Sequence, residues 1–267
     1  MEILPLQKGI IYGPVNSRRL GLSLGINLMP TGHKVCSFNC VYCQYGITMA
    51  LTMRPNAAEL PSPQDVDRAL RDALASVKPP RFITFCGNGE PTLHPNFPEI
   101  ARLVRLVRDE LSPGSEIALL SNSTGLLIPG ISIAIDELID LPIMKLDAGD
   151  EDTFALVARP APGISFESIL EGLRGLEGHF VLQTLFLRGA VNNSDGPLLD
   201  AWMKRVGELR PRSVQIYSID RPFPTRGLEI VPPERLGEIA AETNKRTGIE
   251  VKTYGVARLK GENPSWS

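Results

Sequence analysis

The chain has 267 residues, of which 43% are hydrophobic and 22% are charged, and its formal net charge is −2. This length suits one α/β barrel and supplies enough apolar residues for a large core. The balanced charge excludes a global basic field that would draw the protein to nucleic acid, although one face can still be basic.

Apolar strands and amphipathic helices alternate along the chain. In chain order, the periodicity predicts a strand at 24–28, a helix at 63–77, a strand at 81–86, a helix at 97–111, a strand at 117–120, a helix at 131–139, a strand at 142–146, a helix at 165–176, a strand at 180–187, a helix at 197–209, a strand at 213–219, a helix at 233–246 and a short strand at 251–256. This alternation implies a parallel sheet with right-handed crossovers. Six strand–helix units are too few to close an eightfold barrel, so we predict an α/β fold, a partial (β/α)6 TIM-like barrel. A doubly wound flat sheet is the alternative.

No stretch rich in Pro, Gly or Ser is long enough to divide the chain. We therefore treat residues 1–267 as one domain, with a core at about 20–220 and a C-terminal helix and strand at about 232–256. In either fold, ligands bind beyond the carboxyl ends of the strands. Polar residues at these ends are therefore the candidate site residues.

Three of the four cysteines lie in one loop after the first predicted strand. Cys36, Cys40 and Cys43 have the spacing C-x3-C-x2-C. A structural zinc site needs four protein ligands, whereas a four-iron cluster held by three thiolates keeps one iron open to another ligand. Three thiolates without a partner histidine motif favour iron–sulfur. A zinc site completed by His33 or Cys86 is the alternative.

Short polar motifs follow the next two strands. Gly87, Asn88, Gly89 and Glu90 form a turn in which glycines let the backbone approach a ligand, and an oxygen acceptor there can bind an ammonium group. Ser121, Asn122 and Ser123 end the following strand and either contact the ligand or form a hydrogen-bonded turn.

A lysine and an aspartate end the fourth strand. Lys145, next to Asp147, is a candidate catalytic pair: the lysine would neutralise a bound carboxylate or, with a lowered pKa, form a Schiff base with a carbonyl substrate. A structural ion pair is the alternative. Gln183, on the fifth strand, is expected to line the same pocket.

Basic residues near the first and sixth strands form a candidate patch for an anionic substrate, with plain surface charge as the alternative. The patch comprises Arg18, Arg19, Lys34, Arg221 and Arg226.

The cysteine segment, Cys36-Ser-Phe-Asn-Cys40-Val-Tyr-Cys43, resembles the signature of radical S-adenosylmethionine (SAM) enzymes. The resemblance implies that the three cysteines hold a [4Fe–4S] cluster and that SAM chelates the open iron through its amino and carboxylate groups. An electron then splits SAM into methionine and a 5′-deoxyadenosyl radical, which abstracts hydrogen from a substrate. The resemblance also implies adenine contact by Tyr42, binding of the methionine amino group by residues 87–90, and ribose or carboxylate contacts by residues 121–123.

A narrower resemblance, over roughly residues 11–225, is to the wybutosine-synthesis-related group. It rests on the segments 12–21, 23–28, 87–93, 145–148 and 220–222. The best-known members of that group build a tricyclic base on a tRNA guanosine from pyruvate. They use a second cluster on three cysteines upstream of the signature, and no cysteine stands upstream of Cys36 here.

We therefore expect a radical SAM oxidoreductase that uses a [4Fe–4S] cluster and SAM, with flavodoxin or ferredoxin as its electron donor. Its substrate would be a tRNA base, a peptide or protein, or a small metabolite. A non-catalytic iron–sulfur electron-transfer protein or a zinc-binding module is the alternative from another class. Clustered cysteines indicate a reducing, cytoplasmic compartment, and without a signal peptide or an apolar run of about 18 residues we expect no membrane partner.

Overall fold

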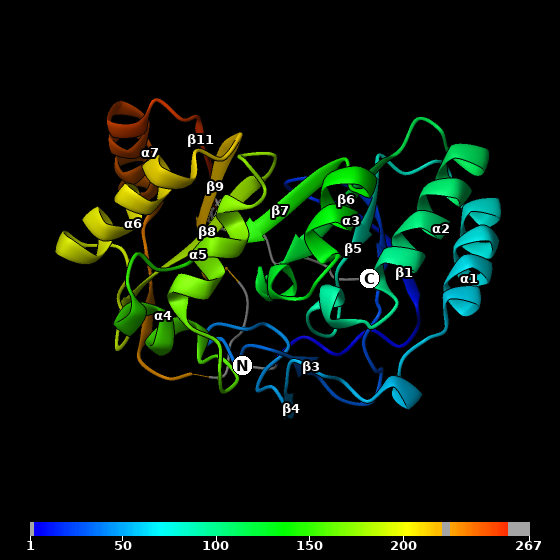
Figure 1. The fold of residues 1–267 in the computed structure, drawn as a ribbon. Helices are drawn as coiled ribbons and strands as arrows, with labels where there is room; N and C mark the ends of the chain where they lie inside the picture. Colours follow the sequence, from blue (N-terminus) through cyan, green and yellow to red (C-terminus); the bar gives the residue numbers. More distant parts are fainter. Residues whose placement is uncertain (1–2, 221–224, 256–267) are drawn as a thin grey trace, which may run out of the picture.

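The central sheet has nine strands, most of them parallel, in the order β1-β2-β5-β6-β7-β8-β9-β11, with β10 added beside β8. The computed structural model describes residues 3–220 and 225–255 (Figure 1). The parallel strands are β2 (Gly21–Ile26), β5 (Phe82–Phe85), β6 (Glu116–Ser121), β7 (Leu141–Lys145), β8 (Val181–Gly189), β9 (Ser213–Ser218) and β11 (Val251–Tyr254). The antiparallel additions are β1 (Ile11–Ser17), which pairs with β2, and β10 (Leu228–Ile230), which pairs with β8.

The sheet is open. β1 and β11 stand at the two ends of the strand order and do not pair with each other within the described residues. Six strands, from β2 to β9, are each followed by helix, and β11 adds a short seventh parallel strand. The predicted α/β fold, a partial barrel, is therefore confirmed.

Helices surround the strands (Figure 1). They are α1 (Pro63–Ser76), α2 (Phe97–Leu111), α3 (Ile131–Leu138), α4 (Glu151–Ala158), α5 (Phe166–Arg174), α6 (Gly196–Leu209) and α7 (Pro233–Thr247), with short 3-10 turns η1 (Ala57–Glu59), η2 (Pro91–Leu93) and η3 (Thr124–Leu127). A separate two-stranded ribbon of β3 (Val35–Cys36) and β4 (Ala50–Leu51) lies below the strands in Figure 1. None of the helices in the described residues has the length and apolar character needed to cross a membrane.

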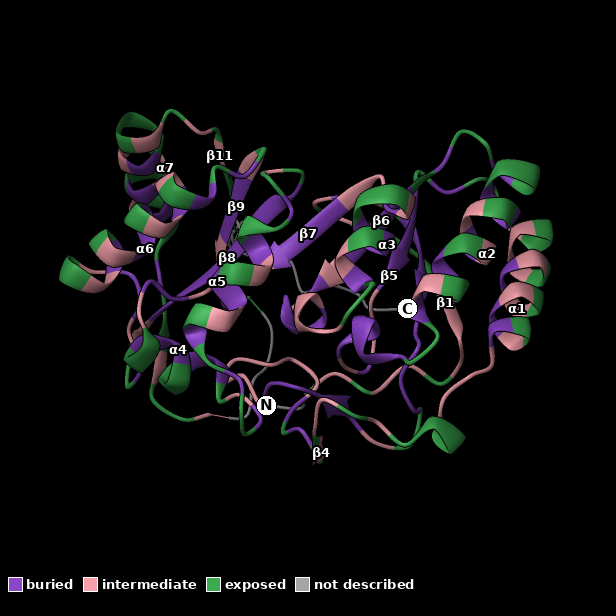
Figure 2. Ribbon diagram, in the orientation of Figure 1, coloured by how far each residue is buried: buried purple, intermediate pink, exposed green. Residues whose placement is uncertain are grey.

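Local signals explain where the helices begin and which face they bury. Ser62 caps α1 through a reciprocal pair of hydrogen bonds with Asp65, and Pro63 occupies the first turn. Val66 and Leu70, four residues apart, are both fully buried against the sheet. Figure 2 shows the same pattern throughout, with buried residues on the strands and on the inner faces of the helices.

Five helices and strands were not predicted, namely β1, β3, β4, β10 and α4, and one predicted strand was displaced. β1 is mostly exposed, so it lacks the apolar alternation of a core strand. α4 has only eight residues and follows β7 after a short turn. The strand predicted at 24–28 ends at Ile26, because the Asn27 side chain turns back to donate to the Met29 carbonyl at 2.8 Å and to accept from the Asn88 N–H at 3.0 Å.

Candidate functional site

The cysteine loop is held at both ends by main-chain hydrogen bonds from distant parts of the chain. On one side, the Val35 N–H donates to the Asn88 carbonyl at 3.3 Å. On the other, the Asn39 and Val41 N–H groups donate to carbonyls of Ala158 and Val157, at 3.0 and 3.1 Å. The loop therefore extends from the end of β5 to the end of α4.

Cys36 is buried, and Cys40 and Cys43 are partly exposed; all three are free thiols. The Cys43 N–H donates to the Cys40 carbonyl at 3.1 Å. Burial, and then repulsion from Cys43 and Cys36, raises the pKa of Cys40 to about 12. Burial likewise raises the pKa of Cys36 to about 11, although the nearby Lys34 charge opposes it. Burial opposes ionisation of the Cys36 and Cys40 thiols, and a bound metal would supply the positive charge that stabilises the thiolates.

This donor set fits a [4Fe–4S] cluster, in which each thiolate binds a different iron. Among the described residues, no three or more His, Cys, Asp or Glu side chains are grouped so as to hold one metal ion. His33 lies 3.4 Å from the Glu59 carboxylate, and the Cys86 sulfur lies 2.6 Å from the Tyr12 hydroxyl.

The turn after β5 is pressed against the cysteine loop. A side chain at Gly89 would overlap the Val35 carbonyl, since a Cβ there would lie 1.6 Å from that oxygen. Gly87 has a φ of +145°, which an L-residue rarely adopts. The Asn88 side chain is fully buried and donates to the carbonyls of Gln7 and Pro30, each at 2.9 Å. It therefore ties the N-terminal segment to the turn. The Asn88 backbone is engaged as well, since its N–H donates to the Asn27 side chain and its carbonyl accepts from the Val35 N–H.

Glu90 holds the next strand end in place. Its carboxylate accepts from the Thr92 N–H, the Thr92 hydroxyl and the Ser121 hydroxyl through Oε1, and from the Asn122 N–H through Oε2 at 2.6 Å. Burial raises the pKa of Glu90, against these hydrogen bonds, which lower it. The carboxylate thus orders the strand ends and has little capacity left for a ligand.

Residues 121–123 face three different directions. Asn122 is partly exposed and donates to the Ser37 hydroxyl at 2.8 Å and towards the Cys36 sulfur at 3.5 Å. Ser121 is bound to Glu90, and the buried Ser123 hydroxyl donates to the Lys145 carbonyl at 2.9 Å. Asn122 is therefore the one of the three whose side chain contacts the cysteine loop.

Lys145 and Asp147 form a partly buried ion pair at 3.0 Å. Tyr42, from the cysteine loop, donates to the same carboxylate, and Lys145 donates to the Tyr217 hydroxyl at 3.1 Å. Burial lowers the pKa of Lys145, but the charge of Asp147 and the contact with Tyr217 outweigh it, so the net pKa is raised. A raised pKa favours the charged amine and so the neutralising role, whereas a Schiff-base lysine needs a lowered pKa.

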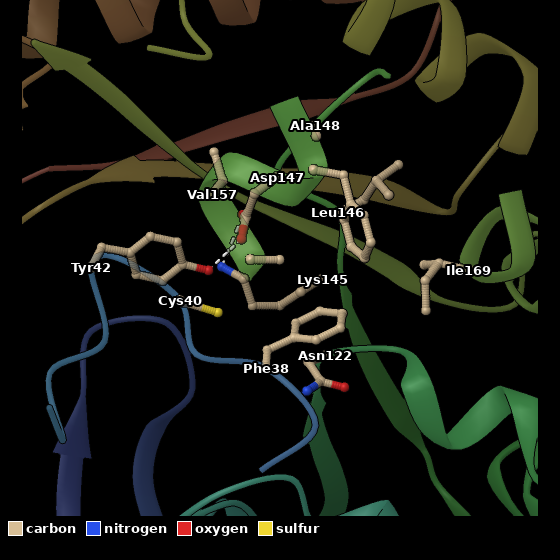
Figure 3. A pocket seen from close by; sticks show the side chains of 12 residues that line it. Phe38, Cys40, Tyr42, Asn122, Lys145, Leu146, Asp147, Ala148, Val157 and Ile169 are labelled. Carbon is tan, nitrogen blue, oxygen red and sulfur yellow. Dashed lines mark hydrogen bonds and ion pairs between the residues drawn. The ribbon is translucent and has the colours of Figure 1, made fainter. Parts of the chain in front are cut away.

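A pocket opens between the cysteine loop and the ends of β6 and β7, with about 350 Å³ of empty space, part of it open to solvent. Figure 3 shows Tyr42, Lys145 and Asp147 converging on one side of it and Asn122 on another. Its lining residues are Phe38, Cys40, Tyr42, Asn122, Lys145, Leu146, Asp147, Ala148, Phe154, Val157, Ala158 and Ile169. Gln183 does not line it. Instead it accepts from the Tyr217 hydroxyl at 3.3 Å and extends the network.

The candidate basic patch is dispersed. Arg18 pairs with Asp220, and the Arg19 guanidinium stacks 4.6 Å from the centre of the Tyr217 ring. Lys34 is buried, Arg226 is exposed, and Arg221 lies outside the described residues.

Sequence reasoning missed Tyr217 and the contributions of α4. Tyr217 joins Lys145, Gln183 and Arg19, and the signal that could have revealed it is the polar residues, Gln183 and Gln215, inside otherwise apolar strands. Phe154, Val157 and Ala158 of α4 line the pocket, but only the tertiary structure brings them there.

A family model described as the radical SAM superfamily matches residues 32–187, which include the whole cysteine loop and the strands from β5 to β7. The chain belongs to the radical SAM superfamily. The cofactors of this superfamily are a [4Fe–4S] cluster and SAM, as the cysteine segment led us to expect.

Two relatives place the chain more narrowly. A UPF0026 protein of Methanocaldococcus jannaschii is 31% identical over 246 residues, which cover 90% of this chain and 72% of the relative. A Brachyspira hyodysenteriae protein named GTPase Obg is 34% identical over 257 residues, which cover 94% of this chain but only 36% of that longer relative. This radical SAM chain belongs with the UPF0026 proteins.

Solved structures share the fold. A radical SAM methyltransferase from Sphaerobacter thermophilus matches with a TM-score of 0.63 at 16% identity, over 87% of this chain and 66% of that one. A structure of TYW1 with a lysine-pyruvate adduct bound matches with a TM-score of 0.57 at 17% identity, over 84% of this chain and 74% of that one. These similarities support the partial-barrel fold.

Proposed function

We propose that this radical SAM protein is an enzyme whose cluster is held by Cys36, Cys40 and Cys43, and which binds SAM in the adjoining pocket. The observation that supports this most is the placement of the pocket: the three-cysteine loop forms one wall, and Asn122 and the Lys145–Asp147 pair form another. When bound, the cluster supplies the electron that splits SAM and so yields the 5′-deoxyadenosyl radical that abstracts hydrogen from the substrate.

Each group of side chains has a distinct task in this proposal. Backbone oxygens of the turn 87–90 accept from the methionine ammonium, and the Glu90 carboxylate fixes that turn relative to β6. Lys145 stays protonated and offers its charge to a carboxylate of SAM or of the substrate, with Asp147 holding it in place. Tyr42 forms the adenine side of the pocket, and its hydroxyl is oriented by Asp147.

We propose an RNA base, in tRNA, as the first candidate substrate. Residues 3–58 contain no acidic residue, although the whole chain is slightly acidic; their basic residues are Lys8, Arg18, Arg19, Lys34 and Arg54. This segment forms the cysteine loop and the β1–β2 hairpin, so a phosphate backbone near them meets no carboxylate from the segment itself.

The cysteine content of the chain differs from that of the wyosine-forming enzymes. No second set of three cysteines exists in the chain. We therefore propose a different modification of an RNA base, with a peptide or small metabolite as the alternative substrate.

The electron donor in this proposal is a small acidic protein such as flavodoxin or ferredoxin. Ile47, Met49 and Leu51 alternate along the segment after Cys43 and are all exposed, with exposed fractions of 65%, 78% and 37%. Three exposed apolar side chains at alternate positions of one short segment form a strip suited to protein contact. The strip lies beside the cysteine loop, as electron transfer requires.

The proposal is tested by anaerobic reconstitution with iron and sulfide, followed by addition of SAM and dithionite. We expect cluster absorbance and formation of 5′-deoxyadenosine. A chain that takes up no cluster, or that forms one without cleaving SAM, would exclude the proposed activity. Candidate substrates, beginning with unmodified tRNA, are then compared by mass spectrometry of the products.

A further inference from the structure

Lys34 is a buried cation that none of the tasks above explains. It is only 4% exposed, and it stands two residues before Cys36. Its ammonium donates to the Gly46 carbonyl at 2.9 Å. An ammonium has three N–H donors, and among the described residues no carboxylate lies within ion-pair distance of this one.

Burying a charge in this way is unfavourable unless another charge compensates it. One good hydrogen bond returns only part of the free energy that a lone ammonium loses when it is removed from water. The buried carboxylate on the neighbouring turn, that of Glu90, is already bound to Thr92, Ser121 and Asn122. The compensating charge must therefore come from another source.

The cysteine loop encloses Lys34. The Gly46 carbonyl that accepts from its ammonium lies three residues after Cys43, and the Gly46 N–H donates to the Cys43 carbonyl at 3.0 Å. The Lys34 charge also acts on the thiols of Cys36 and Cys40. The ammonium is thus held within the loop that carries the three cysteines.

We propose that Lys34 is the counter-cation of the iron–sulfur cluster, a fixed positive charge that favours its reduced form. The inference rests on the proposed ligation of the cluster by Cys36, Cys40 and Cys43. A [4Fe–4S]2+ core with three thiolates carries a net charge of −1. After accepting one electron from the donor, which is thereby oxidised by one electron, it carries a net charge of −2. A nearby cation stabilises the more negative state and so raises the reduction potential.

The other buried lysine of the site does not fill this role. Lys145 is paired with Asp147, so their charges largely cancel at a distance. Lys34 is the cation beside the cysteines whose charge is uncompensated by a carboxylate within the described residues. It acts on the cluster by charge and is a positioning residue, not a catalytic one.

The test is the midpoint potential of the reconstituted cluster, measured by anaerobic titration with dithionite and read by electron paramagnetic resonance. Lys34→Gln removes the charge but keeps a donor for the Gly46 carbonyl, whereas Lys34→Arg keeps the charge. Lys8→Gln, an exposed cation in the same acid-free segment, is the matched control. Iron per chain is determined for every variant.

We expect Lys34→Gln to lower the equilibrium constant for reduction at least tenfold, which corresponds to about 59 mV for one electron. Lys34→Arg and Lys8→Gln should stay within threefold of the wild type. A wild-type potential in Lys34→Gln, or equal losses in the Gln and Arg variants, would overturn the inference. If Lys34→Gln takes up no cluster, the iron content decides: retention in Lys34→Arg supports a charge role, and loss in both contradicts it. Absence of a cluster in the wild type would instead reject the proposed function.

Discussion

The Glu90 carboxylate is the contact on which the geometry of the candidate site depends most. Among the described residues, no Lys or Arg forms an ion pair with this carboxylate. Four hydrogen bonds stabilise it instead, three to Oε1 and one to Oε2. Glu90→Gln can keep the three acceptor contacts of Oε1 by placing its carbonyl oxygen there. Its amide NH2 then faces the Asn122 N–H, so one hydrogen bond is lost and a buried donor meets a donor.

Leaving one buried donor unsatisfied costs about 1–3 kcal/mol. We expect Glu90→Gln to lower the free energy of unfolding of the apoprotein by about 2 kcal/mol, which corresponds to a fall of about 4–8 °C in Tm for a chain of this size. Glu90→Ala leaves all four donors unpaired and should cost about 4 kcal/mol or more, because neighbouring losses do not add simply. The measurement is urea denaturation followed by far-ultraviolet circular dichroism.

Glu137→Gln is the control for this prediction, since Glu137 is exposed on α3 and its substitution should stay within about 0.5 kcal/mol of the wild type. If Glu90→Gln and Glu90→Ala were both as stable as the control, the carboxylate would not organise the strand ends, and the reasoning would be wrong.

A comparison of the wild type with Glu90→Gln also gives a prediction about pH. Burial raises the pKa of Glu90 above its ordinary value of 4.5, so the folded state holds the proton more tightly than the unfolded state. A raised pKa contributes stability that is complete below the unfolded value and is lost as pH rises through the folded value. The stability difference between wild type and Glu90→Gln should therefore shrink as pH is raised from 4.5. A difference that grows over this interval would show that the carboxylate is stabilised by folding.

Three further outcomes follow from the site. Cys40→Ser should lose most of the iron bound on reconstitution, whereas Cys86→Ser should keep wild-type iron, because Cys86 contacts Tyr12 and lies outside the cysteine loop; equal iron loss in both would reject the ligand assignment. Asp147→Asn removes the partner of Lys145, and we expect weaker SAM binding by calorimetry, about tenfold, with the iron content unchanged; unaltered affinity would place SAM elsewhere. Met49→Glu should slow 5′-deoxyadenosine formation driven by reduced flavodoxin at least tenfold and leave the dithionite-driven rate unchanged. The control Ile133→Glu, at an exposed position of α3, should change neither of these two rates. Equal flavodoxin-driven rates in Met49→Glu and wild type would exclude the strip as the donor contact.

The regular part of this fold could be predicted because each element buries one apolar face. Fully buried positions such as Ile83, Ile117 and Val104 recur with the period of a strand or a helix, and that period is visible in the sequence. The cysteine spacing was equally visible, since the three residues lie within one loop.

The contacts that shape the site could not be predicted in the same way, because they join residues far apart in the chain. Asn88 lies in a motif that suggests ligand binding, yet its amide donates to the carbonyls of Gln7 and Pro30, 81 and 58 residues away. No local period marks such a pairing. The carbonyls of Val157 and Ala158 that hold the cysteine loop lie more than 100 residues from it, on a helix too short to give a clear pattern.

The two ends of the open sheet are linked by side chains and not by strand pairing within the described residues. β1 and β11 form the free edges, and the β1–β2 turn reaches β9 through side chains: Arg18 pairs with Asp220, and Arg19 stacks on Tyr217. The Arg18 side chain is 52% exposed, and an exposed ion pair is worth at most about 1 kcal/mol. Within the described residues, no ladder of main-chain hydrogen bonds joins β1 to β11 across this gap.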